Sequence, residues 1–145
     1  MSILYSKFQV VAGLPPHDNS VLRRDIQPKT SVTLTEGDIV DVENASGTEV
    51  VDKMTSLATT NTPPDQPWLV IEGNDQGDGA IANKCTCLKL GTGVVWTVAT
   101  AESFTIGDLC RSLAGVVKPL TGAKEQALGQ IIGVDSANGT VTIAS

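Results

Sequence analysis

The residues most able to carry out chemistry are one histidine and three cysteines. His17 stands between Pro16 and Asp18 in a proline-rich stretch. Nucleophilic catalysis by Ser-His-Asp or Cys-His needs a base held rigidly within hydrogen-bond reach of the nucleophile. A proline-rich arm supports such geometry poorly. We therefore predict that His17 is an exposed loop residue, and we expect no catalytic residue.

The cysteines are spaced unlike a metal site. Cys85 and Cys87 are two apart, which in a strand puts both thiols on one face. Zinc knuckles use Cys-x2–4-Cys and four ligands, and Cys110 could add only a third. Because unpaired cysteines commonly pack as small apolar side chains, we predict core positions for them, with no metal and no cofactor.

Acidic residues suggest two further sites, and both have simpler explanations. The segment 74–79, Asn-Asp-Gln-Gly-Asp-Gly, resembles a calcium loop, but its twelfth position is Cys85 instead of an acid. A polar turn is predicted, and weak cation binding stays open. Asp38 and Asp41 could form a glycosidase pair, which needs a defined separation and an apolar pocket. We instead expect Asp38 in a turn and Asp41 facing outward.

Composition narrows the partners. The 145 residues are 41% hydrophobic but only 3% aromatic, so an aliphatic core is expected, and the net charge is −6. An acidic protein is repelled by nucleic acid and by anionic membranes, so neither is predicted as a partner. No stretch reads as a signal peptide or a membrane span, which favours a cytoplasmic site of synthesis.

The first 31 residues differ from the rest. They hold four basic and two acidic residues, whereas the remainder holds six basic and fourteen acidic residues. Their prolines hold preceding residues extended and remove backbone donors. We predict an extended arm over residues 1–31, with at most one short strand around 7–11. It would dock on the body, residues 32–145, on a sister subunit or on a partner.

From residue 31 onward the pattern is β. Short aliphatic runs are separated by Gly, Pro, Asn and Asp, which favours strands and turns. One short helix is expected around 123–128, and Asn138-Gly139 predicts a two-residue hairpin turn. The fold class is therefore mainly β, a compact barrel or sandwich-like body of one domain. The expected strands are 31–34, 39–42, 49–52, 68–71, 85–90, 94–99, 109–113, 116–117, 130–134 and 140–144.

Two parts of the body are alike. Residues 34–39 and 104–109 both read apolar-Thr-x-Gly-Asp-apolar, and each is followed by a strand, a small-residue turn and a Val-Val pair. Farther on, 69–71 corresponds to 131–132, and 93–99 to 139–145. Because Gly supplies turn dihedrals and Asp bonds nearby backbone donors, we predict two related Gly-Asp β units.

With these two motifs and the closing segments 129–134 and 139–144, the stretch 34–145 resembles the head decoration (cement) proteins of tailed bacteriophages. The resemblance implies a compact β body, often trimeric, on the outer surface of the capsid in the virion, assembled in the host cytoplasm. The arm would clamp adjacent major capsid protein subunits and so stabilise the shell. The long loop 55–67 departs from that pattern.

We expect the arm to supply the capsid contacts, through apolar anchors and two arginines. The alternative is that residues 7–11 form the first strand of the body. Two other functions stay open: another virion β protein, such as a tail tube, baseplate or fibre-base component, and a trimeric β-fold hydrolase. The expected contact residues are Ile3, Leu4, Tyr5, Phe8, Val10, Val11, Leu14, Arg23 and Arg24.

Overall fold

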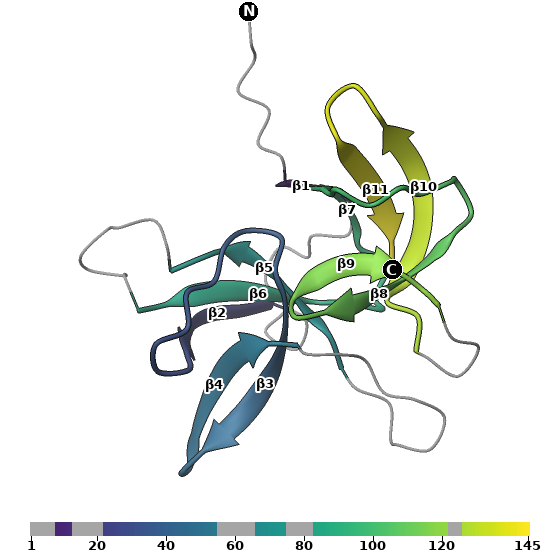
Figure 1. Cartoon of the computed structure of the whole chain (residues 1–145). Coiled ribbons are helices and arrows are strands. Elements are labelled where there is room, and N and C mark those ends of the chain that lie inside the picture. Colours follow the sequence, from purple (N-terminus) through teal and green to yellow (C-terminus); the bar gives the residue numbers. More distant parts are fainter. Residues whose placement is uncertain (1–7, 13–21, 55–65, 75–82, 122–125) are drawn as a thin grey trace, which may run out of the picture.

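The computed structural model describes residues 8–12, 22–54, 66–74, 83–121 and 126–145, and these residues form strands and no helix (Figure 1). The predicted β class is therefore confirmed. No helical segment among them could span a membrane. The strands are β1 (Phe8–Ala12), β2 (Leu22–Pro28), β3 (Ile39–Ala45), β4 (Thr48–Lys53), β5 (Trp68–Glu72), β6 (Cys85–Lys89), β7 (Val95–Ala99), β8 (Leu109–Leu113), β9 (Val116–Pro119), β10 (Gly129–Asp135) and β11 (Thr140–Ala144).

The first unit, β2 to β6, is a closed barrel in the order β2-β4-β3-β5-β6. The barrel closes because β2 pairs antiparallel with β6 on one side and parallel with β4 on the other. Aliphatic and thiol side chains fill its interior together with one tryptophan, in keeping with the low aromatic content. The buried interior residues are Ile26, Leu34, Val40, Val51, Trp68, Val70, Cys85 and Cys87.

The second unit, β7 to β11, has the same strand order but is open. Its sheet runs β7-β11-β10-β8-β9, which matches β2-β6-β5-β3-β4 of the first unit. In the first unit β4 closes against β2. In the second unit β1 pairs with β7 at the corresponding edge, and β9 pairs with β8 alone among the described strands.

The Gly-Asp motifs that suggested a repeat have the same geometry. Asp38 Oδ2 accepts a hydrogen bond from the Thr35 N–H at 2.8 Å, and Asp108 Oδ2 accepts one from the Thr105 N–H at 2.8 Å. This side-chain bond fixes the turn that starts each hairpin. The predicted pair of related Gly-Asp units is thus confirmed.

The match continues into the next strands. Gly37 N–H donates to the Val70 carbonyl at 2.9 Å, and Gly107 N–H donates to the Ile131 carbonyl at 2.8 Å. Immediately after Val70 and Ile131, the registers of β5 with β6 and of β10 with β11 both shift by a bulge. The side chains at matching positions are also buried alike: Leu34 and Phe104, Val40 and Cys110, Val51 and Val117, Cys87 and Ile143.

One part of the predicted correspondence is wrong. Segments 93–99 and 139–145 were matched across the two units, but they are β7 and β11, which are antiparallel neighbours within the second unit. By strand order, β7 corresponds to β2 and β11 to β6. Both segments begin with Gly and continue with Val, Thr and other β-favouring residues, and any half-buried strand can show that composition.

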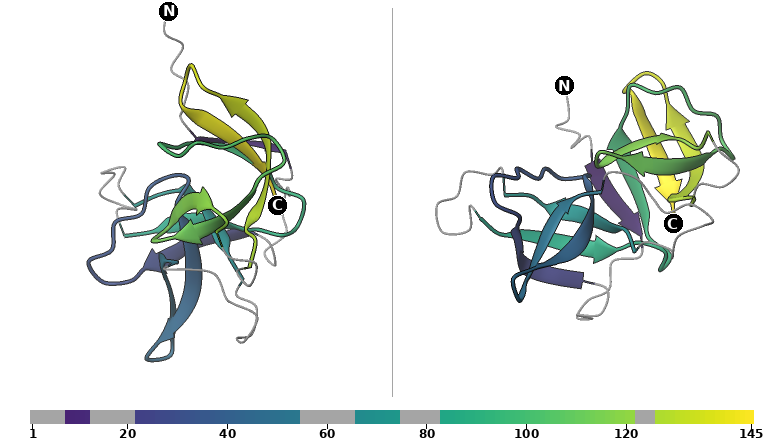
Figure 2. Two further views of the ribbon diagram at one scale, coloured as in Figure 1. Left: turned by 45° about the vertical axis from the view of Figure 1, so that its right-hand side comes forward. Right: turned by 60° about the horizontal axis from the view of Figure 1, so that its bottom comes forward.

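A second core fills the interior of the second unit and continues between the two units, which sit side by side (Figure 2). The β8–β9 turn of the second unit meets the first unit there. Ile39 N–H donates to the Gly115 carbonyl, and Gly115 N–H donates to the Met54 carbonyl, both at 2.9 Å. Gly115 has φ 80°, and a Cβ there would lie 3.2 Å from Lys53 Cγ and 3.3 Å from the Ile39 carbonyl oxygen, so glycine suits this approach.

The arm expected over residues 1–31 is corrected by β2. Residues 22–28 are a barrel strand in which Leu22, Ile26 and Pro28 are buried. The expected boundary between arm and body at residue 31 is therefore wrong, and the described body includes residues 22–28. Asp25, at φ 53°, lies where the register with β6 shifts, which interrupts the alternation expected of a strand.

Three local predictions also change. Residues 31–34 are not a strand, because Ser31 has φ 66° and Val32 N–H closes a turn on the Lys29 carbonyl. The connection between β10 and β11 has four residues, 136–139, instead of the two predicted. Within the expected helix, 126–128 are not helical and 123–125 lie outside the described residues.

Candidate functional site

Strand β1 carries three of the expected contact residues. It pairs with β7, with Phe8 opposite Val98 and Val10 opposite Trp96. Phe8 and Val10 pack against the core between the units, whereas Val11 is 56% exposed. The alternative reading of residues 7–11 as a body strand thus fits residues 8–11. Of these three predicted contacts, Val11 alone faces solvent.

The two arginines lie on the barrel instead of on an arm. Arg23 Nη2 donates to Glu49 Oε2 of β4, forming an ion pair between partly exposed side chains. Arg24 is exposed. Both residues belong to a barrel strand, so their backbone is part of the first unit. The other expected contacts, Ile3, Leu4, Tyr5 and Leu14, lie outside the described residues, as do His17, Asp75 and Asp78.

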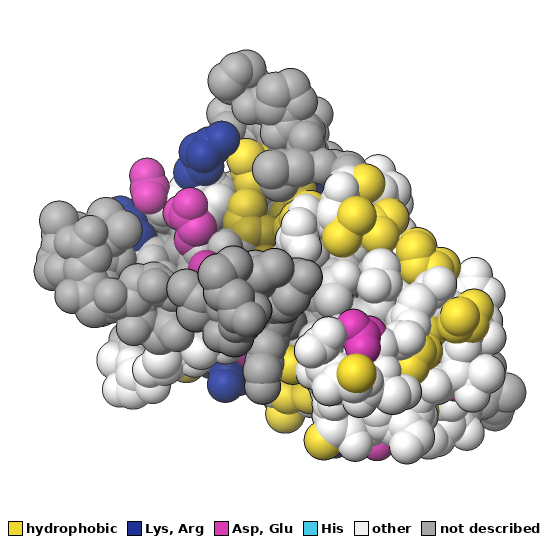
Figure 3. All heavy atoms as spheres, turned by 90° about the horizontal axis from the view of Figure 1, so that it is seen from above, with side chains coloured by type: hydrophobic (Ala, Val, Ile, Leu, Met, Phe, Trp, Pro, Cys, Tyr) yellow, Lys and Arg dark blue, Asp and Glu magenta, His cyan; other side chains and the backbone are white. Residues whose placement is uncertain are grey.

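An aliphatic surface that the sequence reasoning missed covers the outside of the second unit. Hydrophobic side chains gather over that unit in Figure 3. Leu113 pairs with Val116 across the β8–β9 hairpin, and Leu109 pairs with Gln130 of β10. We call this surface the aliphatic face; its exposed residues are Ile106, Leu109, Leu113, Val116 and Ile132. Arg111 and Lys118, which pair across the hairpin, lie between Leu109 and the Leu113–Val116 pair. Exposed apolar residues grouped on one side of a domain mark protein-binding surfaces.

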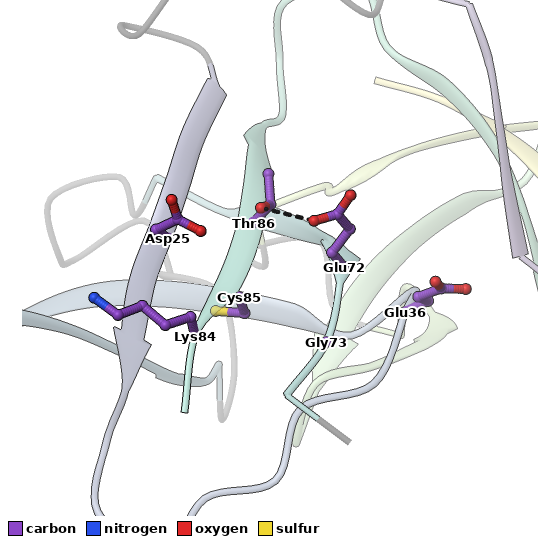
Figure 4. A pocket seen from close by; sticks show the side chains of 7 residues that line it. All are labelled: Asp25, Glu36, Glu72, Gly73, Lys84, Cys85 and Thr86. Carbon is purple, nitrogen blue, oxygen red and sulfur yellow. Dashed lines mark hydrogen bonds between the residues drawn. The ribbon is translucent and has the colours of Figure 1, made fainter. Parts of the chain in front are cut away.

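A shallow depression of about 290 Å³ lies beside the barrel, lined by Asp25, Glu36, Glu72 and Lys84. The three carboxylates point in different directions, and Glu72 accepts a hydrogen bond from Thr86 Oγ1 at 3.3 Å (Figure 4). Among the described residues no three His, Cys, Asp or Glu side chains are grouped to hold a metal ion. The depression therefore offers no converging ligand set.

Cys85 and Cys87 lie on one face of β6, as predicted. Their Sγ atoms are 3.9 Å apart inside the barrel, and neither forms a disulfide. The neighbouring thiol and burial raise the pKa of Cys87, and burial raises the pKa of Cys110 to about 12. Since the thiolate is the reactive form, Cys87 and Cys110 are suited to packing. The hydrogen bond with Cys87 lowers the pKa of Cys85, and this thiol is buried in the barrel interior.

Asn74, the first residue of the segment that resembles a calcium loop, has a structural role. Its Oδ1 accepts from the Leu34 N–H at 2.7 Å and its Nδ2 donates to the Val32 carbonyl at 3.0 Å. These bonds fix the segment that places the fully buried Leu34 in the barrel. The side-chain amide is therefore used inside the protein.

No family model, no curated protein and no solved structure matches this chain.

The aliphatic face was missed because its residues have the pattern of core strands. Leu109 and Leu113 alternate with the buried Cys110 and Ser112. This alternation predicts which residues share a face but not which face is covered. A signal was nevertheless present, since Leu109 and Cys110 are both apolar although they face opposite sides.

Proposed function

We propose that this protein is a decoration protein of a phage head. It binds the outer surface of the capsid as a homo-oligomer, a trimer, and stabilises contacts between major capsid protein subunits. The observation that carries the proposal is the position of β1. This strand is at the end of the six-stranded sheet, directly follows residues 1–7, and exposes Val11.

An edge strand has a row of backbone donors and acceptors that can pair with a strand of another protein. Among the described strands, β1 has β7 as its single neighbour. A capsid strand could pair with the other side of β1, and Val11 would supply apolar contact. Because such binding requires the assembled shell, it would stabilise the shell by mass action.

Several such contacts in one oligomer would act together. Each contact of a single strand is small, but a trimer that engages three subunits converts the second and third contacts into intramolecular events. The resulting avidity would make the bound trimer a bridge between capsid subunits. The proposed stabilisation therefore depends on both the N-terminal contact and oligomerisation.

The test is binding to capsids that lack decoration. Purified protein is mixed with such capsids and cosedimented, and capsid opening is followed by heating. We expect the full chain to bind and to raise the opening temperature. Val11→Lys should weaken binding about tenfold, the effect of losing one central apolar contact. Val134→Lys, at another exposed valine outside β1 and the aliphatic face, is the matched control.

The outcomes separate two claims. No binding by the full chain would refute decoration itself. Binding that is equally strong in the wild type, in Val11→Lys and in a chain lacking residues 1–7 would refute the N-terminal contact. A tail tube or baseplate component is the second candidate, because both β1 and β9 are edges of the described sheet and could join neighbouring subunits. Its position and copy number in the particle would distinguish it.

A further inference from the structure

We propose that the aliphatic face binds a second copy of this chain, and that it receives the β3–β4 turn, Ser46 and Gly47, of that copy. The contact would repeat, between molecules, the contact that joins the two units within one molecule. Matching positions of the two units support this contact independently of the proposed role on a capsid.

The first unit has an outer face that is already covered. Ile39 and Met54 are 0% and 2% exposed there. Met54 N–H donates to the Ile39 carbonyl at 3.0 Å, while the Ile39 N–H and the Met54 carbonyl both bond Gly115 of the second unit. The peptide of Gly115 is thus inserted into the splayed end of the β3–β4 hairpin. We call this position the notch.

The second unit has the same notch, and it is uncovered. Leu120 N–H donates to the Leu109 carbonyl at 3.1 Å, as Met54 does to Ile39. The Leu109 N–H and the Leu120 carbonyl match the two groups that hold Gly115, and neither has a hydrogen bond among the described residues. Leu109 is 45% exposed. This notch therefore combines an apolar surface with one donor and one acceptor.

The glycines of the two Gly-Asp turns, Gly37 and Gly107, differ in the same way as the two notches: the first is covered and the second is not. A Cβ at Gly37 would lie 3.1 Å from Val98 and 3.2 Å from Phe8, so the inter-unit contact covers it. A Cβ at Gly107, its counterpart, would have nothing within 4 Å. The uncovered region of the second unit thus corresponds to the interface of the first unit.

The segment that could fill the open notch is also present. The β8–β9 turn has φ 52° at Ala114 and 80° at Gly115, and the β3–β4 turn has φ 54° at Ser46 and 86° at Gly47. Figure 1 shows the β3–β4 hairpin projecting from the first unit. A Cβ at Gly47 would meet nothing within 4 Å. The two turns have the same shape, and one of them is unoccupied.

The predicted contact joins different surfaces of the two copies, a turn on one and a notch on the other. Such a head-to-tail contact forms a ring when its rotation closes and a filament when it does not. It differs from a two-fold contact, in which each surface would meet itself. This difference gives a direct test.

The test is a disulfide between two single variants. A Cβ at Gly115 would lie 3.3 Å from Lys53 Cβ. Pro119 is the counterpart of Lys53, because Lys53 pairs with Val40 of β3 and Pro119 pairs with Cys110, the matching residue of β8. Disulfides need Cβ atoms about 3.5–4.5 Å apart. Mixing Gly47→Cys with Pro119→Cys under oxidation should therefore give a disulfide-linked dimer. Neither variant alone should form one.

Sedimentation of uncross-linked protein provides the second readout. We expect self-association of the wild type, weakened about tenfold or more by Leu109→Lys and by Gly47→Asn, which keeps a residue tolerant of positive φ but adds a side chain to the inserted turn. Ser46→Asn in the same turn is the control, because its counterpart Ala114 is exposed within the intrachain contact. Circular dichroism checks that each variant is folded.

A folded wild type that stays monomeric at its highest soluble concentration would overturn the proposal. So would dimers formed equally by Gly47→Cys alone, or association that Leu109→Lys and Gly47→Asn leave unchanged. Association by this contact without capsid binding would uphold this proposal while refuting decoration. Capsid binding by a chain that stays monomeric would refute this proposal and the trimer, while upholding capsid binding itself.

Discussion

Removing the Asn74 side-chain amide should destabilise the barrel by about 2 kcal/mol. Asn74→Ala takes away the acceptor of the Leu34 N–H and the donor to the Val32 carbonyl. An unsatisfied backbone donor costs about 1–3 kcal/mol, and an ordinary hydrogen bond contributes about 1 kcal/mol. The site is only partly buried, so water can replace some of the loss. The two terms together give a loss of about 2–4 kcal/mol in the free energy of unfolding, and the lower half of this range is expected.

The assay is urea unfolding followed by tryptophan fluorescence. With a slope of about 2 kcal/mol per M for a domain of this size, the midpoint should fall by about 1 M. Asn83→Ala, at an exposed neighbouring asparagine, is the matched control and should stay within about 0.5 kcal/mol of the wild type. Asn74→Asp keeps the acceptor but points a carboxylate oxygen at the Val32 carbonyl, so it should also lose stability.

Equal midpoints for Asn74→Ala and Asn83→Ala would refute the reasoning. That result would mean that segment 32–34 is positioned by Leu34 packing alone. A changed slope would instead show that unfolding is no longer two-state, and the midpoint could not then be converted into a free energy.

Three further predictions concern the second unit and the thiols. Gly129→Ala should lower the free energy of unfolding in urea by about 2 kcal/mol, because its Cβ would lie 2.6 Å from a β11 backbone oxygen. Gly133→Ala, whose nearest contacts would be at 3.3 Å, should lower it less, and equal losses in the two variants would contradict this. Hydrogen bonds from Asn138 lower the pKa of Asp135, so Asn138→Ala should raise it toward 3.8 in an NMR titration. A carboxyl whose pKa is lowered by folding stabilises the folded state at pH values above its unfolded-state pKa, and this stability is lost as the pH falls. Asn138→Ala should therefore lose less stability in acid than the wild type. An unchanged pKa of Asp135 in this variant would refute the role of Asn138. Near pH 8 a thiol reagent should label the native protein slowly, because all three cysteines are buried and burial raises the pKa of Cys110 to about 12. All three cysteines should react once the protein is unfolded, and rapid labelling of the native protein would contradict this.

The features that the sequence predicted best are local. Gly37 and Gly107 have φ 93° and 98°, a region that glycine adopts without a steric penalty. Asp38 and Asp108 then bond backbone donors three residues away. Because residue type and short spacing determine both features, the repeated turn could be read from the sequence and the repeated unit could be inferred from it.

Strand β2 could not be recognised in this way. Its sequence, Leu-Arg-Arg-Asp-Ile-Gln-Pro, places four polar side chains among three buried ones, and the bulge at Asp25 breaks the alternation. The strand exists because β6 and β4 flank it, and both pairings join residues far apart in the chain. Tertiary pairing of this kind overrides the local preference.

Burial of the outer faces was also beyond the sequence. Ile39 and Leu109 occupy matching positions after the same Gly-Asp motif, yet Ile39 is 0% exposed and Leu109 is 45% exposed. Local sequence cannot explain this difference. It arises because the first unit has the second unit beside it, while the corresponding side of the second unit has no neighbour among the described residues.

The position of β1 determines how the N-terminal contact must be tested. Deleting residues 1–31, which the arm prediction suggests, would remove β2 and open the barrel. Deleting 1–12 would remove Phe8 and Val10, two half-buried side chains worth about 2 kcal/mol together. A chain lacking 1–7 should therefore unfold at the wild-type urea midpoint and still bind capsids more weakly, whereas a chain lacking 1–12 should lose both stability and binding. A lowered midpoint in the shorter deletion would show that residues 1–7 stabilise the body, and weak capsid binding would then have to be explained by that loss of stability.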